Sequence, residues 1–129
     1  MKKIIKSLLV VCMIGCSLVA FSQEKAEWPA IKTFHGIMGK VFHPTEENNF
    51  QPLRDSVSVL VEKAIEWKNS AVPAGYNEEV TKPTIAKLVK QCKSIQKAVK
   101  ANKTNDQLKP MIIKAHDIFH EIMEKCKNE

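Results

Sequence analysis

The chain has 129 residues, of which 44% are hydrophobic and 26% are charged, and its formal net charge is +6 at pH 7. This length suits one domain with one modest core. The lysines are spread along the chain without forming a basic block, and aromatic residues are few, so the composition argues against a nucleic-acid-binding protein.

The first 22 residues have the pattern of a secretory signal peptide. Three lysines precede an apolar run that ends in the small residues Ala20 and Ser22, which stand where signal peptidase reads the chain. We therefore expect cleavage after residue 22, a mature domain of residues 23–129 and a periplasmic or secreted location. The alternative is a lipoprotein cleavage site, with a lipid anchor on Cys16. No other segment is long and apolar enough to predict a membrane span.

The first predicted helix has one apolar stripe that includes a histidine. Its members recur at spacings of three and four: Trp28, Ile31, His35, Met38 and Phe42. We expect this helix to end at His43, because Pro44 disfavours the helical conformation in the residue before it. A second helix follows, with its stripe at Leu53, Val57, Leu60, Ala64 and Trp67.

The longest predicted connection precedes the third helix. It carries Pro73, Gly75 and Pro83, and Thr81 is the expected cap of the helix that follows. The stripe of the third helix is Ile85, Leu88, Cys92, Ile95 and Val99. The stripe of the fourth is Leu108, Ile112, His116, Phe119, Met123 and Cys126. Four amphipathic helices with short or medium connections predict an all-α fold, an antiparallel up-down-up-down four-helix bundle.

Three histidines are expected to meet between the first and fourth helices. At about 1.5 Å of rise per residue, His35 and His120 fall roughly 10 to 14 Å from the same end of the bundle, and His116 falls about one turn further in. A buried imidazole needs partners for two ring nitrogens, and these stripes offer few hydroxyls or carboxylates. The sequence therefore predicts a transition-metal site, for zinc or copper, at these three histidines, with Met38 as a fourth donor.

Other side chains have ligand chemistry too. His43 is interpreted as a helix-terminus residue that is placed favourably against the helix dipole. The alternative is a second, exposed metal site formed by His43 with Glu46 and Glu47. Cys92 is interpreted as a small buried hydrophobic residue, with metal ligation as the alternative. Because Cys92 and Cys126 are expected at different heights in the bundle, we predict two free thiols.

Two glycines, Gly36 and Gly39, flank the turn that holds His35. Glycine in a helix interior costs up to about 1 kcal/mol relative to alanine, so something should compensate. Either the close approach of a neighbouring helix or room for a bulky ligand would explain them.

Common catalytic signatures are missing from the sequence. It has no Cys-x-x-Cys-His motif for covalent haem, no His-Glu-x-x-His zinc motif and no Glu-x-x-His pairs of the di-iron type. A glycine-rich phosphate loop is missing too. We therefore expect a protein that is not an enzyme.

The positions of Met38 and of His116 or His120 resemble the ligand layout of cytochrome c-prime and the periplasmic b-type cytochromes. This resemblance implies a four-helix bundle that holds haem at one end, through a histidine of the last helix and, in the b-type proteins, a methionine of the first. Where the c-prime pattern has two cysteines before its histidine, this chain has His116 and Phe119 before His120. Covalent haem is therefore excluded. The similarity concerns the layout of residues 26–127.

The sequence thus leaves three interpretations of function. The preferred one is an exported bundle that binds a transition metal and buffers it or hands it to a partner protein. The first alternative is a non-covalent haem b protein for electron transfer, with Met38 and either His116 or His120 as axial ligands and with a redox partner. The second alternative is a structural or interaction bundle without a cofactor.

Overall fold

The computed structural model describes residues 27–128, most of which belong to four helices. These are α1 (Pro29–Glu46), α2 (Gln51–Asn69), α3 (Glu78–Lys100) and α4 (Asn105–Lys125). The described residues form no strand, only an isolated β-bridge between Tyr76 and Lys127. The prediction of an all-α fold with four helices is confirmed. The predicted signal peptide and the lipid site at Cys16 lie outside the described residues.

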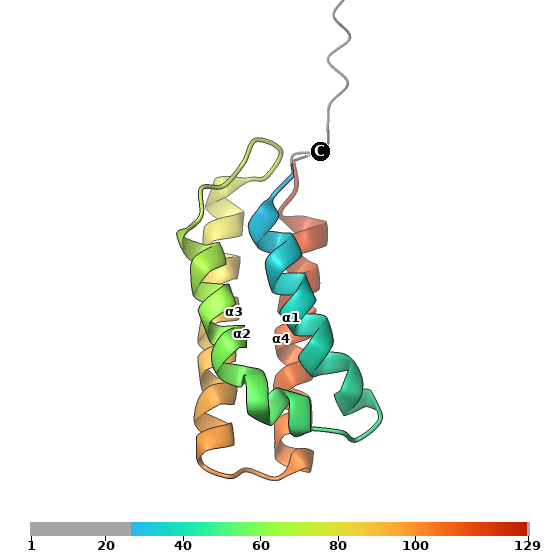
Figure 1. The fold of residues 1–129 in the computed structure, drawn as a ribbon. Helices are drawn as coiled ribbons and strands as arrows, with labels where there is room; N and C mark the ends of the chain where they lie inside the picture. The colour runs from blue at the N-terminus through green and yellow to red at the C-terminus, as the bar shows by residue number, and fades with distance from the viewer. Residues whose placement is uncertain (1–26, 129) are drawn as a thin grey trace, which may run out of the picture.

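Each helix packs against the next one along the chain, and α1 also lies beside α4 (Figure 1). The α1–α2 and α3–α4 connections lie at one end of the molecule, and the α2–α3 connection lies at the other end, near the C-terminus (Figure 1). The backbones of α1 and α4 come close at fewer points than those of any consecutive pair of helices. The α1–α4 side is therefore the most open side of the bundle.

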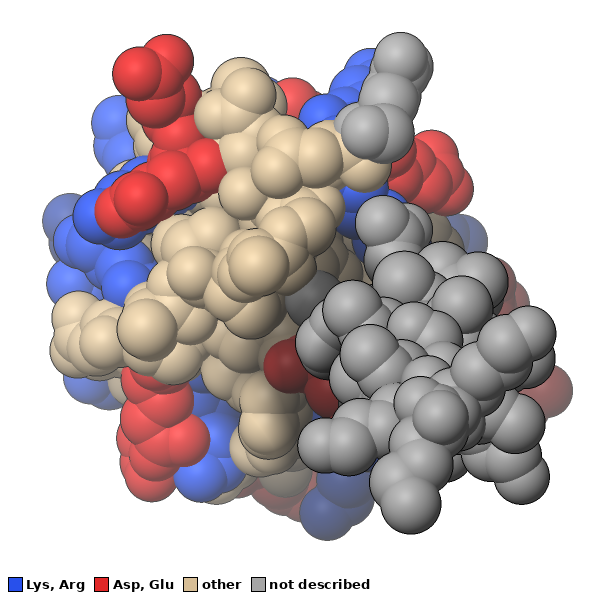
Figure 2. Space-filling model, turned by 90° about the horizontal axis from the view of Figure 1, so that it is seen from above, with Lys and Arg blue, Asp and Glu red and all other residues tan. Residues whose placement is uncertain are grey.

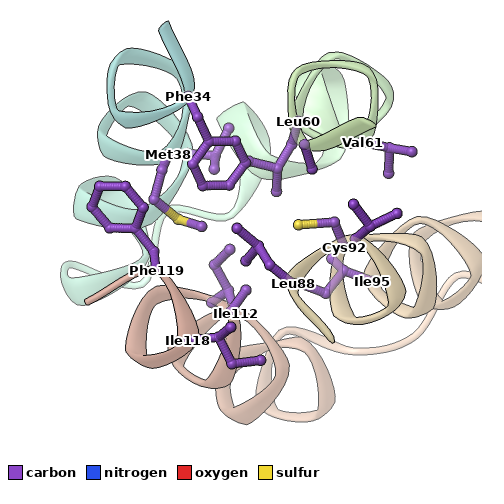
Figure 3. Packing of buried hydrophobic residues seen from close by; sticks show 14 of the residues in the cluster. Phe34, Met38, Leu60, Val61, Leu88, Cys92, Ile95, Ile112, Ile118 and Phe119 are labelled. Atoms are coloured by element: carbon purple, nitrogen blue, oxygen red, sulfur yellow. The ribbon is translucent and has the colours of Figure 1, made fainter. Parts of the chain in front are cut away.

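One hydrophobic core fills the space between the four helices. Figure 3 shows Phe34 and Met38 of α1 facing Leu88 of α3 and Phe119 of α4. The stripes predicted for the second and third helices are confirmed, because all their members are buried except Val99, which is half-buried. Cys92 and Cys126 are both buried and free, as predicted.

The predicted stripes of the first and fourth helices are wrong at their histidines. Phe34 is buried in place of His35, which is exposed, because an aromatic hydrocarbon one residue away gains more from burial than an imidazole does. In α4, Ala115 and Ile118 are buried on the core side, whereas His116 is half-buried and His120 is exposed. The histidines of both helices thus lie at the edge of the core.

Two predicted helix ends also need correction. Helix α1 continues through Pro44 to Glu46, because the Pro44 carbonyl accepts hydrogen bonds from the backbone N–H groups of Glu47 (3.1 Å) and Asn49 (2.9 Å). The cap of helix α3 lies four residues before the predicted cap at Thr81. This cap is Asn77, whose side-chain oxygen accepts bonds from the backbone N–H groups of residues 79 and 80.

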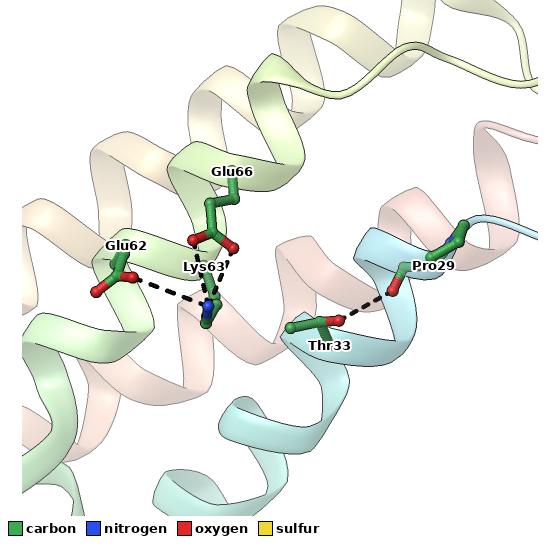
Figure 4. Close-up of polar contacts among 5 residues, drawn as sticks. All are labelled: Pro29, Thr33, Glu62, Lys63 and Glu66. Carbon is green, nitrogen blue, oxygen red and sulfur yellow. Dashed lines mark hydrogen bonds and ion pairs between the residues drawn. The ribbon is translucent and has the colours of Figure 1, made fainter.

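The outer faces of the helices are polar. In α2, the Lys63 ammonium lies 3.8 Å from Glu62 and 3.1 Å from Glu66, and in α1 the Thr33 hydroxyl donates a hydrogen bond of 3.2 Å to the Pro29 carbonyl (Figure 4). Exposed pairs of this kind contribute little to stability. The fold is therefore held mainly by its core.

The last residues of the described chain are fastened to the α2–α3 connection. The Asn77 N–H donates to the Cys126 carbonyl at 2.8 Å, and the Asn128 N–H donates to the Gly75 carbonyl at 2.7 Å. Gly75 has φ of 100°, which favours glycine. Residues 70–77 of this connection carry no charge, and Figure 2, which views this end, shows an uncharged central surface framed by charged residues.

Candidate functional site

The centre of the candidate site is a pair of histidines on α4. His116 and His120 lie one helical turn apart, and their rings meet at 4.4 Å between centroids. The two Nε2 atoms are 3.2 Å apart. His116 is half-buried and His120 is exposed, so the pair faces solvent at the α1–α4 side.

The separation of the two Nε2 atoms suits one metal ion as well as one shared proton. Two donors 3.2 Å apart, each about 2.0 to 2.1 Å from an ion, subtend about 100° at that ion. This angle lies between those of square-planar and tetrahedral coordination. Alternatively, one neutral ring donates an N–H to the other. Both arrangements require at least one neutral imidazole.

The surroundings of His116 favour its neutral form. The pKa of His116 is lowered, first by burial and second by the neighbouring charge of His120. The charges of Asp117, His43 and Glu46 also act on this pKa, with the carboxylates raising it. Since the neutral ring is the form that binds metal, a lowered pKa helps His116 to accept an ion near neutral pH.

Aromatic rings from α1 support the pair. Phe42 stacks on His116 with ring centroids 3.9 Å apart and an interplanar angle of 7°. Phe42 also contacts the ring of His43 edge to face, at 5.6 Å. The Nδ1 atom of His43 lies 3.1 Å from Glu46 Oε2. His43 and Glu46, two residues of the possible second site, thus lie near enough to His116 for their charges to act on it. Glu47, the third, follows the last residue of α1.

His35 contacts the residue that precedes His120. Its imidazole stacks on Phe119 at 5.4 Å, and Phe119 in turn meets His120 edge to face at 5.6 Å. Within residues 27–128, no group of three or more His, Cys, Asp or Glu side chains is gathered closely enough to hold a metal ion. The structure brings together two of the three predicted histidines, His116 and His120, whereas the ring contact of His35 is with Phe119.

Met38, the predicted fourth donor, and Cys92, whose metal ligation was the alternative, are both enclosed in the core. Met38 is 1% exposed, with its sulfur among Phe34, Phe119 and other core residues (Figure 3). Burial raises the pKa of Cys92 to about 12, so this thiol stays protonated at neutral pH and the thiolate that a metal requires is not available. Both side chains contribute to packing.

An apolar groove of about 380 Å³ runs beside the pair, between the start of α1 and the end of α4. His35 and His120 lie on its wall, and Phe119 and Tyr76 contribute aromatic surface. The remaining lining residues are Glu27, Trp28, Pro29, Ile31, Lys32 and Met123. The sequence stripes did not predict this groove, because it depends on the α2–α3 connection bringing Tyr76 against Trp28, at 5.1 Å between ring centroids.

The glycines of α1 leave space at this side. A Cβ atom at Gly36 would meet nothing within 4 Å, and one at Gly39 would meet only the His43 ring, at 3.7 Å from Cδ2 and 3.9 Å from Nε2. Close approach of a neighbouring helix therefore does not explain either glycine. The other predicted explanation, room for a ligand, remains open.

Comparison of the chain with protein-family models, with curated proteins and with solved structures finds no match. The resemblance to the cytochromes thus remains a likeness of layout between four-helix folds. Within residues 27–128, no helix has both the length and the apolar character that crossing a membrane requires.

Proposed function

We propose that this protein is an exported four-helix bundle that binds a transition metal through His116 and His120 and serves to buffer the ion or to hand it to a partner protein. The observation that carries the proposal is the 3.2 Å separation of the two Nε2 atoms. Imidazole pairs of this kind suit zinc and copper alike. Because His120 is exposed, an ion held here can exchange with another protein, as buffering or handover requires.

The proposal includes the topology and the export of the chain. An antiparallel up-down-up-down arrangement is supported by the order of ring contacts between α1 and α4. Phe42 contacts His116, whereas His35, seven residues earlier on α1, contacts Phe119, three residues later on α4. Export rests on the signal pattern of residues 1–22.

Metal titration of the purified protein tests the proposal. We expect the wild type to bind about one equivalent of zinc(II) or copper(II) by calorimetry, and the His116→Ala, His120→Ala double variant to bind at least about a hundredfold more weakly. Elemental analysis of the protein as purified identifies the metal. Wild-type affinity in the double variant would refute the proposal.

The apolar groove favours a second candidate function, the binding of non-covalent haem b for electron transfer. A volume of about 380 Å³ falls in the range of small-molecule sites, and His35 and His120 are both on the wall as axial-ligand candidates. Addition of haemin would then produce a Soret band that weakens in His35→Ala. If the histidine pair binds a metal ion instead, His35→Ala should have the same metal affinity as the wild type. A protein that binds neither metal nor haem would be a structural or interaction bundle.

A further inference from the structure

We propose that His43 is a third metal-binding side chain, contributed by α1 and oriented by Glu46, so that a divalent ion bound at His116 and His120 ties α1 to α4. This inference rests on the proposed function and deepens it. It names a ligand set of three imidazoles from two helices, a set that suits zinc(II) or copper(II).

The His43 ring already has the orientation of a metal ligand. Its Nδ1 atom faces the Glu46 carboxylate at 3.1 Å, so Nδ1 carries the proton that this carboxylate accepts. The Nε2 atom is then left with a free lone pair. It lies over Gly39, where a Cβ atom would stand 3.9 Å from it, an ordinary van der Waals distance.

His120 also has a carboxylate near its Nδ1 atom, at a longer distance and on the other helix. Its Nδ1 atom lies 3.9 Å from a carboxylate oxygen of Glu124, one turn further along α4, and its Nε2 atom faces His116. Histidines that bind metals usually direct their second ring nitrogen to a carboxylate or carbonyl, which fixes the tautomer and makes the ligand more basic. The contact between His43 and Glu46 is therefore of the kind typical of metal-binding histidines, whereas 3.9 Å between His120 and Glu124 is too long for a hydrogen bond.

His43 is also close enough to His116 for its charge to act on the His116 ring. Phe42, the preceding residue, stacks on His116, and the charges of both His43 and Glu46 reach the His116 ring. His35 lacks these features. Its ring stacks on Phe119, and within the described residues it makes no hydrogen bond or ion pair.

Binding through His43 requires its ring to move. The three rings do not surround one point, and the His43 side chain is 67% exposed, so no core packing holds it in place. The helices joined in this way, α1 and α4, are those whose backbones are the least closely packed. A bound ion would therefore act where the bundle is most open.

Zinc binding in five proteins tests the inference: wild type, His43→Ala, His35→Ala, Glu46→Gln and the His116→Ala, His120→Ala double variant. We expect His43→Ala to bind zinc(II) about ten to a hundred times more weakly than the wild type, and His35→Ala to bind like the wild type. In nitrogen-15 spectra of the imidazoles, one equivalent of zinc should shift His43 together with His116 and His120 and leave His35 unshifted. Glu46→Gln should lower the affinity less than His43→Ala does. The Nδ1–H tautomer of His43 should be present before zinc is added.

The outcomes separate the two proposals. If the double variant loses zinc while His43→Ala keeps wild-type affinity and the His43 signals do not move, the third ligand is refuted and the pair stands. Equal losses in His35→Ala and His43→Ala would also refute it, because the loss would not depend on the carboxylate-oriented ring. If the double variant binds zinc like the wild type, both proposals fail. Circular dichroism of each variant checks that the exposed substitutions leave the fold intact.

Discussion

The indole N–H of Trp28 donates a hydrogen bond of 2.9 Å to the hydroxyl of Ser70 and so joins the residue before α1 to the residue after α2. The same hydroxyl donates to the Trp67 carbonyl at 2.6 Å. Trp28 is 6% exposed, so its N–H has little access to water as a substitute partner. Ser70 thus closes one end of the bundle beside the apolar groove.

Replacing this hydroxyl should destabilise the protein. We expect Ser70→Ala to lower the free energy of unfolding by about 1 to 3 kcal/mol, because it leaves the buried Trp28 N–H unpaired. Urea unfolding measures the loss. Ser58→Ala is a matched control, since Ser58 only accepts an exposed hydrogen bond from Gln96 and its loss should stay within about 0.5 kcal/mol. Equal losses in the two variants would contradict the assigned role of Ser70.

The cap of α4 offers a second test. The Thr104 hydroxyl accepts a hydrogen bond from the Gln107 N–H at 3.2 Å, and the Thr104 N–H donates one of 3.0 Å to the side-chain oxygen of Gln107. Thr104→Ala should cost about 1 kcal/mol in thermal or urea unfolding, whereas Thr104→Ser should cost little because it keeps the oxygen. Similar losses for alanine and serine would show that the capping bond contributes nothing.

Cys92 should be chemically silent in the folded protein. Its pKa is raised to about 12 from the ordinary 9.0, so the reactive thiolate is scarce at pH 8. In a Cys126→Ser variant, a thiol reagent should label Cys92 only after unfolding. Above pH 9, the unfolded state loses a proton that the folded state keeps, so this thiol should lower stability as the pH rises. Rapid labelling of the native protein would contradict the assigned burial.

Acid should destabilise the metal-free protein through His116. Its pKa lies below the ordinary 6.5, mainly because of burial and then of His120, so the unfolded state binds a proton more readily than the folded state. The stability that His116 contributes is therefore fully present above about pH 6.5, and it should be lost as the pH falls below that value. Unfolding experiments at pH 7 and pH 5 measure the change, and a His116→Leu variant should show a smaller drop. An equal drop in both proteins would assign the effect to other groups.

The stripes of α2 and α3 could be predicted from the sequence because each helix has one regularly spaced set of apolar residues. Leu53 to Trp67 and Ile85 to Ile95 each offer a single face, and the core uses that face. In α1 the choice was between two adjacent positions, Phe34 and His35. Spacing rules alone cannot decide between such neighbours, whereas the free energy of burying hydrocarbon favours Phe34.

The candidate site was predictable only in part. The spacing of His116 and His120 placed them on one turn, and the structure brings their Nε2 atoms together. The position of His43 beside this pair was missed, because it depends on the stacking of Phe42 on His116 across two helices. Contacts of this kind depend on how each helix is rotated about its own axis. A shift of the buried stripe by one residue changes this rotation and therefore the contacts.

The edge-to-face contact of Trp28 with Trp67, at 5.7 Å, has an optical consequence. Trp67 also meets Phe119 at 5.9 Å, and Phe119 meets His120 at 5.6 Å, so both indoles of the chain belong to a run of rings that ends at the histidine pair. Paramagnetic copper(II) bound there would quench the indole emission, whereas diamagnetic zinc(II) would leave its intensity nearly unchanged. If the proposed site binds one of these ions, the fluorescence of the native protein would therefore tell an observer which of the two it is, without any added dye.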